Sequence, residues 1–182
     1  MRKVIASEFV SLDSVMEAPD RWQFPYFNDE MGEAVGAEMS QADTMLLGRV
    51  TYQEFASYWP TSTDEPFASH LNNTPKFVVS RTLEEPLEWQ NSTLIKENVA
   101  EEIVKLKQQP GKDISILGSA TLVRSLLRDD LLDELRLMVH PIVLGSGKRL
   151  FEDRGDQKDL KLVDSKTFRT GVLYLISQSA GR

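Results

Sequence analysis

The sequence predicts an α/β fold with three layers, built on a mostly parallel mixed sheet that ends in a C-terminal antiparallel hairpin. Strand-like apolar segments alternate with helix-like segments along most of the chain, and this alternation is typical of a parallel sheet. The last two strand-like segments are separated only by Phe168-Arg-Thr-Gly171. Because Gly171 can adopt the positive φ that hairpin loops often need, these two segments are predicted to pair antiparallel.

The individual elements follow from the spacing of apolar residues. Strands are expected where short apolar runs are bounded by turn residues, and helices where apolar residues recur every three or four positions. The predicted strands cover 3–11, 44–47, 77–80, 92–95, 114–117, 134–144, 160–167 and 172–177. The predicted helices cover 29–39, the segment from 49 onward, 97–109 and 120–127. Asn28 is a candidate N-cap for the first helix, Pro110-Gly111 ends the third, and 60–66 is expected to be a loop.

The chain is expected to form one domain over residues 1–182. Its length is close to the usual size of a domain, and its 41% hydrophobic content is enough for a substantial core. No Gly/Ser-rich or Pro-rich linker divides it. The lack of cysteine excludes disulfides and thiolate sites and suits a reducing cytoplasm. No uncharged apolar run approaches the roughly 20 residues that span a bilayer, so we expect a cytoplasmic protein without membrane association.

The charge balance narrows the choice of partners. A net charge of −7 argues against nucleic acid as the main partner, because phosphate backbones are held by basic patches. A few arginines in one cleft can still bind a dinucleotide on an acidic protein. His70 and His140 each lack a second histidine at ligand spacing, so no metal site is expected.

The segment from Thr44 to Tyr52 carries the chemistry of a phosphate site. Its apolar run ends in Gly48-Arg49 and leads directly into a predicted helix. The N–H groups and positive dipole end of a helix N-terminus favour an anion, and Gly48 lets the backbone approach it closely. Arg49 and Thr51 would add charge-assisted and hydroxyl hydrogen bonds. Taken alone, the motif is also compatible with an ordinary turn between a strand and a helix.

Two further strand-like runs end in the same way, at Ser80-Arg81 and at Gly118-Ser119. In a parallel sheet these ends collect along one edge, where open α/β sheets bind ligands. Two arginines supply cations for more than one phosphate group, which favours a dinucleotide with an extra ribose phosphate over one without it; the alternative is that both are ordinary surface residues. The residues predicted to bind the coenzyme are Gly48, Arg49, Thr51, Ser80, Arg81, Gly118, Ser119, Ala120, Thr121 and Leu122.

Four motifs, in this order, resemble the dihydrofolate reductase superfamily. They are the segments 46–52, 78–82 and 117–122 and the long segment 133–147. Within that superfamily the chain is most similar to the C-terminal reductase domain of bifunctional riboflavin-biosynthesis deaminase-reductases and to stand-alone proteins of that type. The resemblance covers about residues 3–176. It implies a dihydrofolate reductase-like fold, NADPH-dependent reduction and, since such relatives are commonly dimers, a homodimer.

Asp13 is the first candidate on the substrate side. It follows the first predicted strand, and a carboxylate there can hydrogen-bond the N–H groups of a heterocycle or pass on a proton. An Asp in a turn more often caps its own backbone. The resemblance favours function, because a Ser-Leu-Asp corner recurs in these reductases, usually with Gly where this chain has Ser14. Asp13 is therefore predicted to be catalytic, with an ordered water as the alternative proton donor.

Aromatic residues crowd the segment after this corner. They could form a lid that stacks on a planar substrate, or a hydrophobic plug over the core or a dimer interface. Gly145, after the long strand, could border the substrate or simply turn the chain. The residues predicted to bind substrate are Asp13, Trp22, Phe24, Phe27 and Gly145.

Departures from the relatives bear on the substrate. Riboflavin-pathway reductases generally have an acidic residue just ahead of the glycine in the third motif, where this chain has Ile116-Leu117. No residue matches the substrate acid of classical folate reductases. We therefore expect hydride transfer to a small conjugated heterocycle of pterin or pyrimidine type. Two other functions fit the sequence: a non-catalytic NADP(H)-binding or sensing dimer, and a structural dimer associating through the aromatic segment and strand 137–144.

Overall fold

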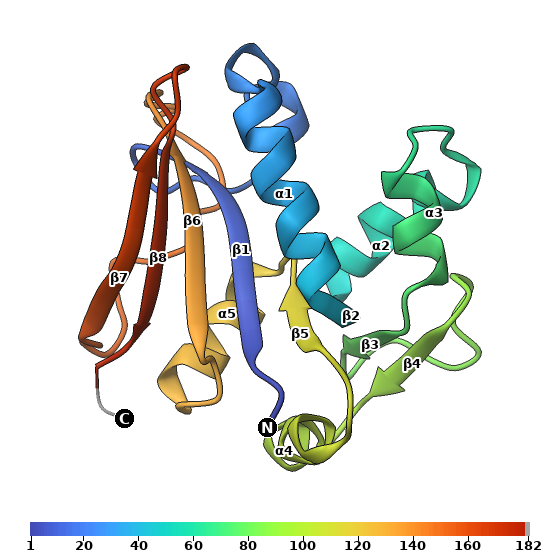
Figure 1. The fold of residues 1–182 in the computed structure, drawn as a ribbon. Coiled ribbons are helices and arrows are strands. Elements are labelled where there is room, and N and C mark those ends of the chain that lie inside the picture. The colour runs from blue at the N-terminus through green and yellow to red at the C-terminus, as the bar shows by residue number, and fades with distance from the viewer. Residues whose placement is uncertain (181–182) are drawn as a thin grey trace.

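The computed structural model describes residues 1–180, which form an eight-stranded mixed sheet with helices on both faces (Figure 1). The strand order is β4-β3-β2-β5-β1-β6-β8-β7. The first six of these strands run parallel to one another, whereas β8 and β7 are antiparallel additions at one end. The predicted parallel sheet with a C-terminal hairpin is confirmed.

The observed elements match most of the predicted ones within a few residues. The strands are β1 (Val4–Ser11), β2 (Ala42–Gly48), β3 (Lys76–Val79), β4 (Ser92–Ile95), β5 (Asp113–Ile116), β6 (Glu134–His140), β7 (Leu160–Thr167) and β8 (Leu173–Ser179). The helices are α1 (Asp29–Gln41), α2 (Arg49–Tyr58), α3 (Phe67–Asn73), α4 (Val99–Gln108) and α5 (Ala120–Arg128). Asn28 caps α1 as predicted, because its side chain accepts a hydrogen bond from the backbone N–H of Met31 at 3.1 Å.

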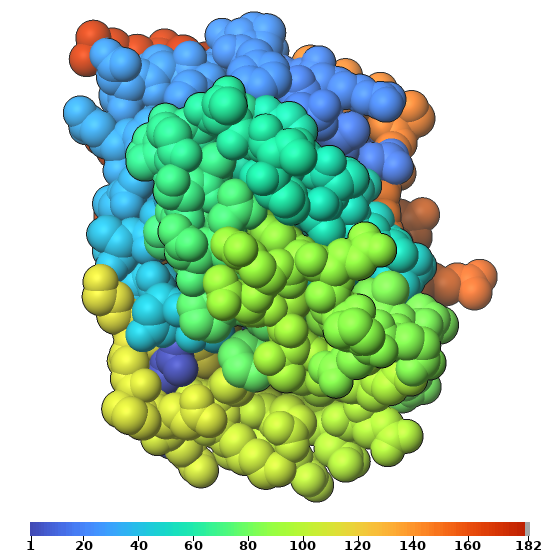
Figure 2. All heavy atoms as spheres, turned by 90° about the vertical axis from the view of Figure 1, so that its right-hand side faces the viewer, coloured from blue at the N-terminus to red at the C-terminus, as the bar shows by residue number. Residues whose placement is uncertain are grey.

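Three apolar clusters define the layers. On one face of the sheet, α4 and α5 pack over the central strands around buried residues such as Leu126 and Ile116. On the other face, α1 packs near β6 around Met31, and α2 with α3 packs over β2 and β3 around Trp89. Figure 2 looks onto the β4 end of the molecule, where the green residues of α3 through the start of α4 form the surface. The core is therefore continuous under α4 and α5 and divided into two clusters under α1 and α2.

One expectation about the elements was wrong, and one helix was not predicted. The sixth strand ends at His140 and not at residue 144, because Pro141 lacks the N–H that would extend the ladder. The helix Phe67–Asn73 was not predicted, since it has only seven residues and its buried face is limited to Ala68 and Leu71. Strand β6, which includes residues 137–140 of the predicted dimer strand 137–144, lies inside the sheet. It pairs with β1 on one side and with β8 on the other.

Candidate coenzyme and substrate site

The three predicted coenzyme segments lie at one edge of the sheet. Gly48 is the last residue of β2 and is in register with Val79 of β3, so Ser80 and Arg81 follow beside it. On its other side β2 pairs in parallel with β5, with Leu46 opposite Ile116, which brings Gly118 to the same edge. The convergence predicted from the sequence is confirmed.

The two glycine motifs interlock. The backbone N–H of Gly48 donates to the carbonyl oxygen of Gly118 at 3.1 Å. A Cβ atom added at Gly48 would lie 2.2 Å from Oγ of Ser119, and one added at Gly118 would lie 2.5 Å from Oγ1 of Thr51. Gly118 also has a φ of +128°, a conformation that other residues rarely adopt. Both positions therefore require glycine for close approach of the two segments.

Two helices begin at this edge of the sheet. Helix α2 begins directly after Gly48, which provides no side-chain cap. Helix α5 begins after Ser119, whose hydroxyl accepts a hydrogen bond from the N–H of Leu122 at 3.4 Å. Ala120 and Leu122 are buried, whereas Thr121 is exposed. Such a pair of N-termini beside a glycine cradle has the donor chemistry that a pyrophosphate requires.

The cations at this edge have few protein partners. Arg49 is exposed, and its Nη1 donates to Oε1 of Gln53 at 3.0 Å. Arg81 is exposed and has no ion-pair or hydrogen-bond partner among residues 1–180. Ser80 is buried, and its hydroxyl accepts hydrogen bonds from the N–H groups of Thr82 and Leu83 at 3.2 and 3.1 Å. Ser80 thus shapes the turn that presents Arg81 to solvent.

Asp13 is tied by its carboxylate to a distant loop. One oxygen accepts hydrogen bonds from Oγ of Ser11 at 2.6 Å and from the N–H of Leu144 at 3.1 Å, and the other accepts from the N–H of Gly145 at 2.9 Å. The Ser11 hydroxyl and these two backbone groups lower the pKa of Asp13 to about 2. Asp13 is therefore ionised at neutral pH and can accept hydrogen bonds but does not hold a proton to give.

Further hydrogen bonds join the corner at Asp13 to the loop after β6. The N–H of Leu150 donates to the carbonyl of Ser14 at 2.9 Å. Nε of Arg149 donates to the carbonyl of Asp13 at 3.1 Å, and its Nη2 lies 3.8 Å from the carboxylate. The sequence analysis missed Arg149, because no local pattern links it to a residue 136 positions earlier. Ser14 has a φ of +70°, a conformation that favours glycine.

The aromatic residues of the segment 19–27 fall into two groups. Trp22 is buried, and its indole N–H donates to the carbonyl of Glu17 at 3.0 Å. Phe24 and Phe27 are exposed by 65% and 40%, respectively. Leu12 and Val143, on neighbouring corners at the ends of β1 and β6, are exposed by 63% and 66%. Leu12 and Val143 therefore expose apolar side chains on the two corners that the carboxylate of Asp13 joins.

Residues 1–180 hold neither a metal-binding cluster nor a membrane-spanning helix. No three histidine, aspartate or glutamate side chains there are grouped so that they could hold a metal ion. None of the helices in this part of the chain is both long and apolar enough to cross a membrane.

The fold and the glycine motifs agree with a family model. The model of the RibD C-terminal domain matches residues 2–174. The chain belongs to this family. Its relatives include the uncharacterized protein YyaP of Bacillus subtilis (strain 168), which is 34% identical over 180 residues, or 96% of this chain and 94% of YyaP. A second relative, YwjB of the same organism, is 30% identical over 176 residues, or 94% of this chain and 95% of YwjB.

Solved structures of the RibD C-terminal domain type share the fold. A putative riboflavin biosynthesis protein from Shewanella sp. PV-4 superposes with a TM-score of 0.79 at 22% identity, covering 97% of this chain and 98% of that one. The predicted dihydrofolate reductase-like fold is thereby confirmed. At 22% identity, this likeness shows a shared fold.

Proposed function

We propose that this RibD C-terminal domain protein is an NADPH-dependent reductase that transfers a hydride to a small conjugated heterocycle of pterin or pyrimidine type. The observation that carries the proposal is the interlocked pair of glycine motifs at the carboxyl edge, flanked by two helix N-termini and by Arg49 and Arg81. A dinucleotide phosphate needs backbone N–H donors and extra cations together. This edge supplies both.

The coenzyme would be held by the ten residues predicted from the sequence. The backbone N–H groups at the starts of α2 and α5 would bind the pyrophosphate, with Gly48 and Gly118 leaving room for it. Arg81 would bind the ribose phosphate, because its guanidinium has no protein partner in residues 1–180 and follows the neighbouring strand. When bound, NADPH supplies the hydride.

The substrate side would work by positioning. Phe24, Phe27, Leu12 and Val143 expose apolar surface that can stack on a planar ring and exclude water. The ionised carboxylate of Asp13 would accept a hydrogen bond from a ring N–H and orient the heterocycle. Because Asp13 holds no proton at neutral pH, we propose that an ordered water delivers the proton, the alternative that the sequence left open.

A titration with two coenzymes tests the binding proposal. Arg81→Ala is expected to weaken NADPH binding about tenfold or more, as for loss of a hydrogen bond to a charged group, and to leave NADH binding unchanged. Fluorescence titration of both coenzymes measures this ratio. Equal losses for NADPH and NADH would remove Arg81 from the ribose-phosphate role.

A turnover assay tests Asp13. Asp13→Asn is expected to leave the Kd of NADPH unchanged and to reduce turnover, because the amide presents one acceptor oxygen where the carboxylate presents two. NADPH oxidation across a panel of pterins and pyrimidines measures turnover. Wild-type turnover is expected to show no titration from Asp13 between pH 4 and 9, since its pKa is about 2. Full activity of the variant would make Asp13 a turn residue only.

The second candidate function is a non-catalytic NADP(H)-binding or sensing dimer. It is favoured by the exposure of the apolar side chains that would cover a substrate, Phe24 among them. The same titration separates the two functions, since tight NADPH binding without oxidation across the heterocycle panel supports sensing. We place the protein in the cytoplasm in either case.

We also propose a homodimer in which the hairpin, and not strand 137–144, makes the contact. Strand β7 is at the end of the sheet, and Leu162 and Val163 on it are exposed by 55% and 43%. Leu173 at the start of β8 is exposed by 40%. Apolar side chains on an edge strand favour association between copies. Light scattering of Leu162→Asp, with a shift to the monomer mass expected, tests this assignment.

A further inference from the structure

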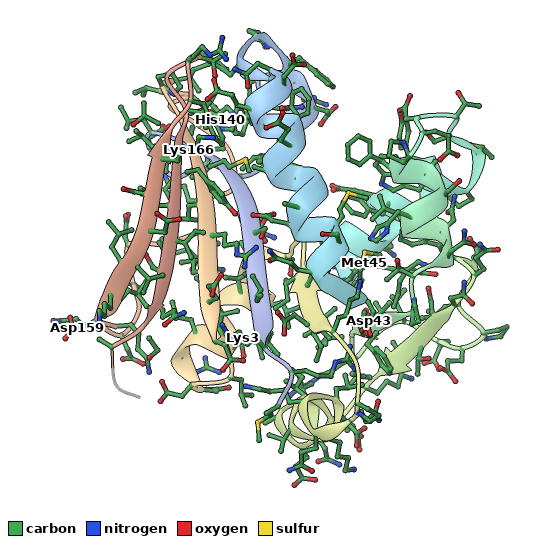
Figure 3. All side chains as sticks on the ribbon, in the orientation of Figure 1. Lys3, Asp43, Met45, His140, Asp159 and Lys166 are labelled. Atoms are coloured by element: carbon green, nitrogen blue, oxygen red, sulfur yellow. The ribbon has the colours of Figure 1, made fainter. Side chains whose placement is uncertain are left out.

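His140 lies completely buried at the carboxyl end of β6 (Figure 3). Its Nδ1 is 2.9 Å from the carbonyl oxygen of Met138 and 3.2 Å from that of Val10. Both oxygens are acceptors, so Nδ1 must carry the hydrogen. Burial lowers the pKa of His140 below its ordinary value, so Nε2 is a bare acceptor at neutral pH. The imidazole thus joins the ends of β1 and β6 through Nδ1 alone.

Aromatic rings surround His140. The ring of Trp22 lies edge-on at 5.0 Å between centroids, and those of Phe9 and Tyr26 lie edge-on at 5.7 Å. Trp22 and Tyr26 belong to the segment 19–27, named here the aromatic loop. Trp22 and Tyr26, the rings of the aromatic loop that pack inward, therefore both contact the imidazole of His140.

Apolar packing alone does not account for an imidazole at this position. Its Nε2 has no hydrogen-bond partner in residues 1–180, and an unsatisfied buried acceptor costs roughly 1–3 kcal/mol. Oε1 of Gln23 and Oγ1 of Thr170 are also buried without partners. Gln23 follows Trp22 in the aromatic loop, and Thr170 precedes Gly171, whose added Cβ would lie 3.3 Å from the ring of Pro141. The polar atoms left unsatisfied here come from segments that meet around the end of β6.

The neighbouring strand β1 connects His140 with Asp13. His140 is opposite Ser11 in the register of β6 and β1, and the Ser11 hydroxyl donates to Asp13 at 2.6 Å. A shift of His140 would therefore move the aromatic loop relative to the corner that carries Asp13. Phe24 and Phe27, the exposed members of the loop, would move with it.

We propose that His140 is a positioning residue that fixes the aromatic loop on the ends of β1 and β6. It thereby sets the distance between Asp13 and the exposed rings of Phe24 and Phe27. This inference rests on the proposed reductase function only for its kinetic consequence. The structural part concerns the packing of Trp22 and can be measured without any substrate.

The test compares His140→Phe with His140→Asn and with His70→Phe. Phenylalanine keeps a ring among the aromatic residues but loses the bonds from Nδ1, whereas asparagine keeps an N–H donor and loses the ring. His70, the other histidine of the sequence, is half-buried beside Asp43 at the opposite edge and serves as the control. The indole N–H resonance of Trp22, assigned with Trp22→Phe, reports the loop.

We expect both His140→Phe and His140→Asn to move the Trp22 resonance. Both variants should also raise the KM for the heterocycle about tenfold, the equivalent of 1.4 kcal/mol. The kcat and the Kd of NADPH should stay within twofold of wild type. His70→Phe is expected to change none of these. An unmoved Trp22 resonance in folded variants would overturn the proposal, as would equal losses in NADPH affinity and KM. Absence of NADPH binding by the wild type would instead contradict the proposed function. The Trp22 resonance would still show whether His140 positions the aromatic loop.

Discussion

The amino ends of the parallel strands form one edge of the sheet and their carboxyl ends form the other. These two edges, called here the amino edge and the carboxyl edge, differ in how their cations are paired. At the amino edge, two buried cations are paired with carboxylates: Arg2 forms an ion pair with Asp43, and Lys107 lies 2.6 Å from Asp133. At the carboxyl edge, Arg49 and Arg81 are exposed and have no acidic partner in residues 1–180. Figure 3 places Lys3 and Asp43 at one end of the molecule and His140 at the other. Cations at the amino edge thus stabilise the fold, whereas Arg49 and Arg81 at the carboxyl edge are exposed to solvent, where we propose that they bind the coenzyme.

The two edges also differ in how their backbone N–H groups are bonded. The motifs at Gly48 and Gly118 meet at the carboxyl edge, where α2 begins without a side-chain cap. At the amino edge, backbone groups are taken up by side chains, as when the carboxylate of Asp133 accepts from the N–H of Val4 at 2.8 Å. An edge that binds an anion must leave donors unpaired, whereas an edge that stabilises the fold must not.

The largest expected effect comes from breaking the amino-edge pair. Lys107→Met removes the cation that lies 2.6 Å from the carboxylate of Asp133 in a largely buried site, and removing one partner of such a pair costs about 3 kcal/mol or more. Urea denaturation measures the free energy of unfolding. The control is Lys105→Met, which removes an exposed pair with Glu102 on the same helix and should cost less than about 0.5 kcal/mol. Weaker NADPH binding by folded Lys107→Met would contradict the separation of roles between the edges.

A smaller effect, confined to binding, is expected at the carboxyl edge. Gly118→Ala puts a Cβ atom 2.5 Å from Thr51 and keeps a positive φ, so the two glycine motifs must separate. Strain of this kind, about 1–3 kcal/mol, should weaken NADPH binding by up to about a hundredfold. Isothermal titration measures the Kd. Gly36→Ala is the control, because an added Cβ there meets no heavy atom within 4 Å. Equal affinity in wild type and Gly118→Ala would remove the glycine cradle from the site.

Lys76 sharpens the comparison, because it is a fully buried cation at the amino end of β3 that has carbonyl partners in place of a carboxylate. Its Nζ donates to the carbonyl of Thr74 at 2.7 Å and lies 4.2 Å from the centroid of the Trp89 ring. Burial lowers the pKa of Lys76 to about 8. The unfolded chain then binds the proton more tightly between pH 8 and pH 10.5, so folding stability rises with pH across that window.

The expected gain for wild type relative to Lys76→Met is about 2 kcal/mol between pH 7.5 and pH 9.5. The comparison with Lys76→Met cancels the titration of other groups. Urea unfolding of both proteins at the two pH values measures the difference. Parallel changes in the two proteins would show that Lys76 titrates as an ordinary surface lysine does.

The sequence predicted the sheet because strands and helices leave local traces. The apolar runs that became β2, β3 and β5 were each identified from neighbouring residues, and the ends of parallel strands must share an edge. The positions of Gly48, Ser80 and Gly118 followed from that rule. A seven-residue helix such as α3 leaves too short a pattern to be recognised in this way.

The amino-acid order by itself thus determined the fold class, the order of the strands along the chain and the edge at which the glycines gather. Only the tertiary structure decided what each polar side chain does there. Asp13 is joined to Leu144 and Gly145, more than 130 positions away, and His140 is joined to Val10 at a separation of 130. Burial and partners fix whether a carboxylate is ionised or an imidazole neutral, and both depend on contacts that no local spacing encodes.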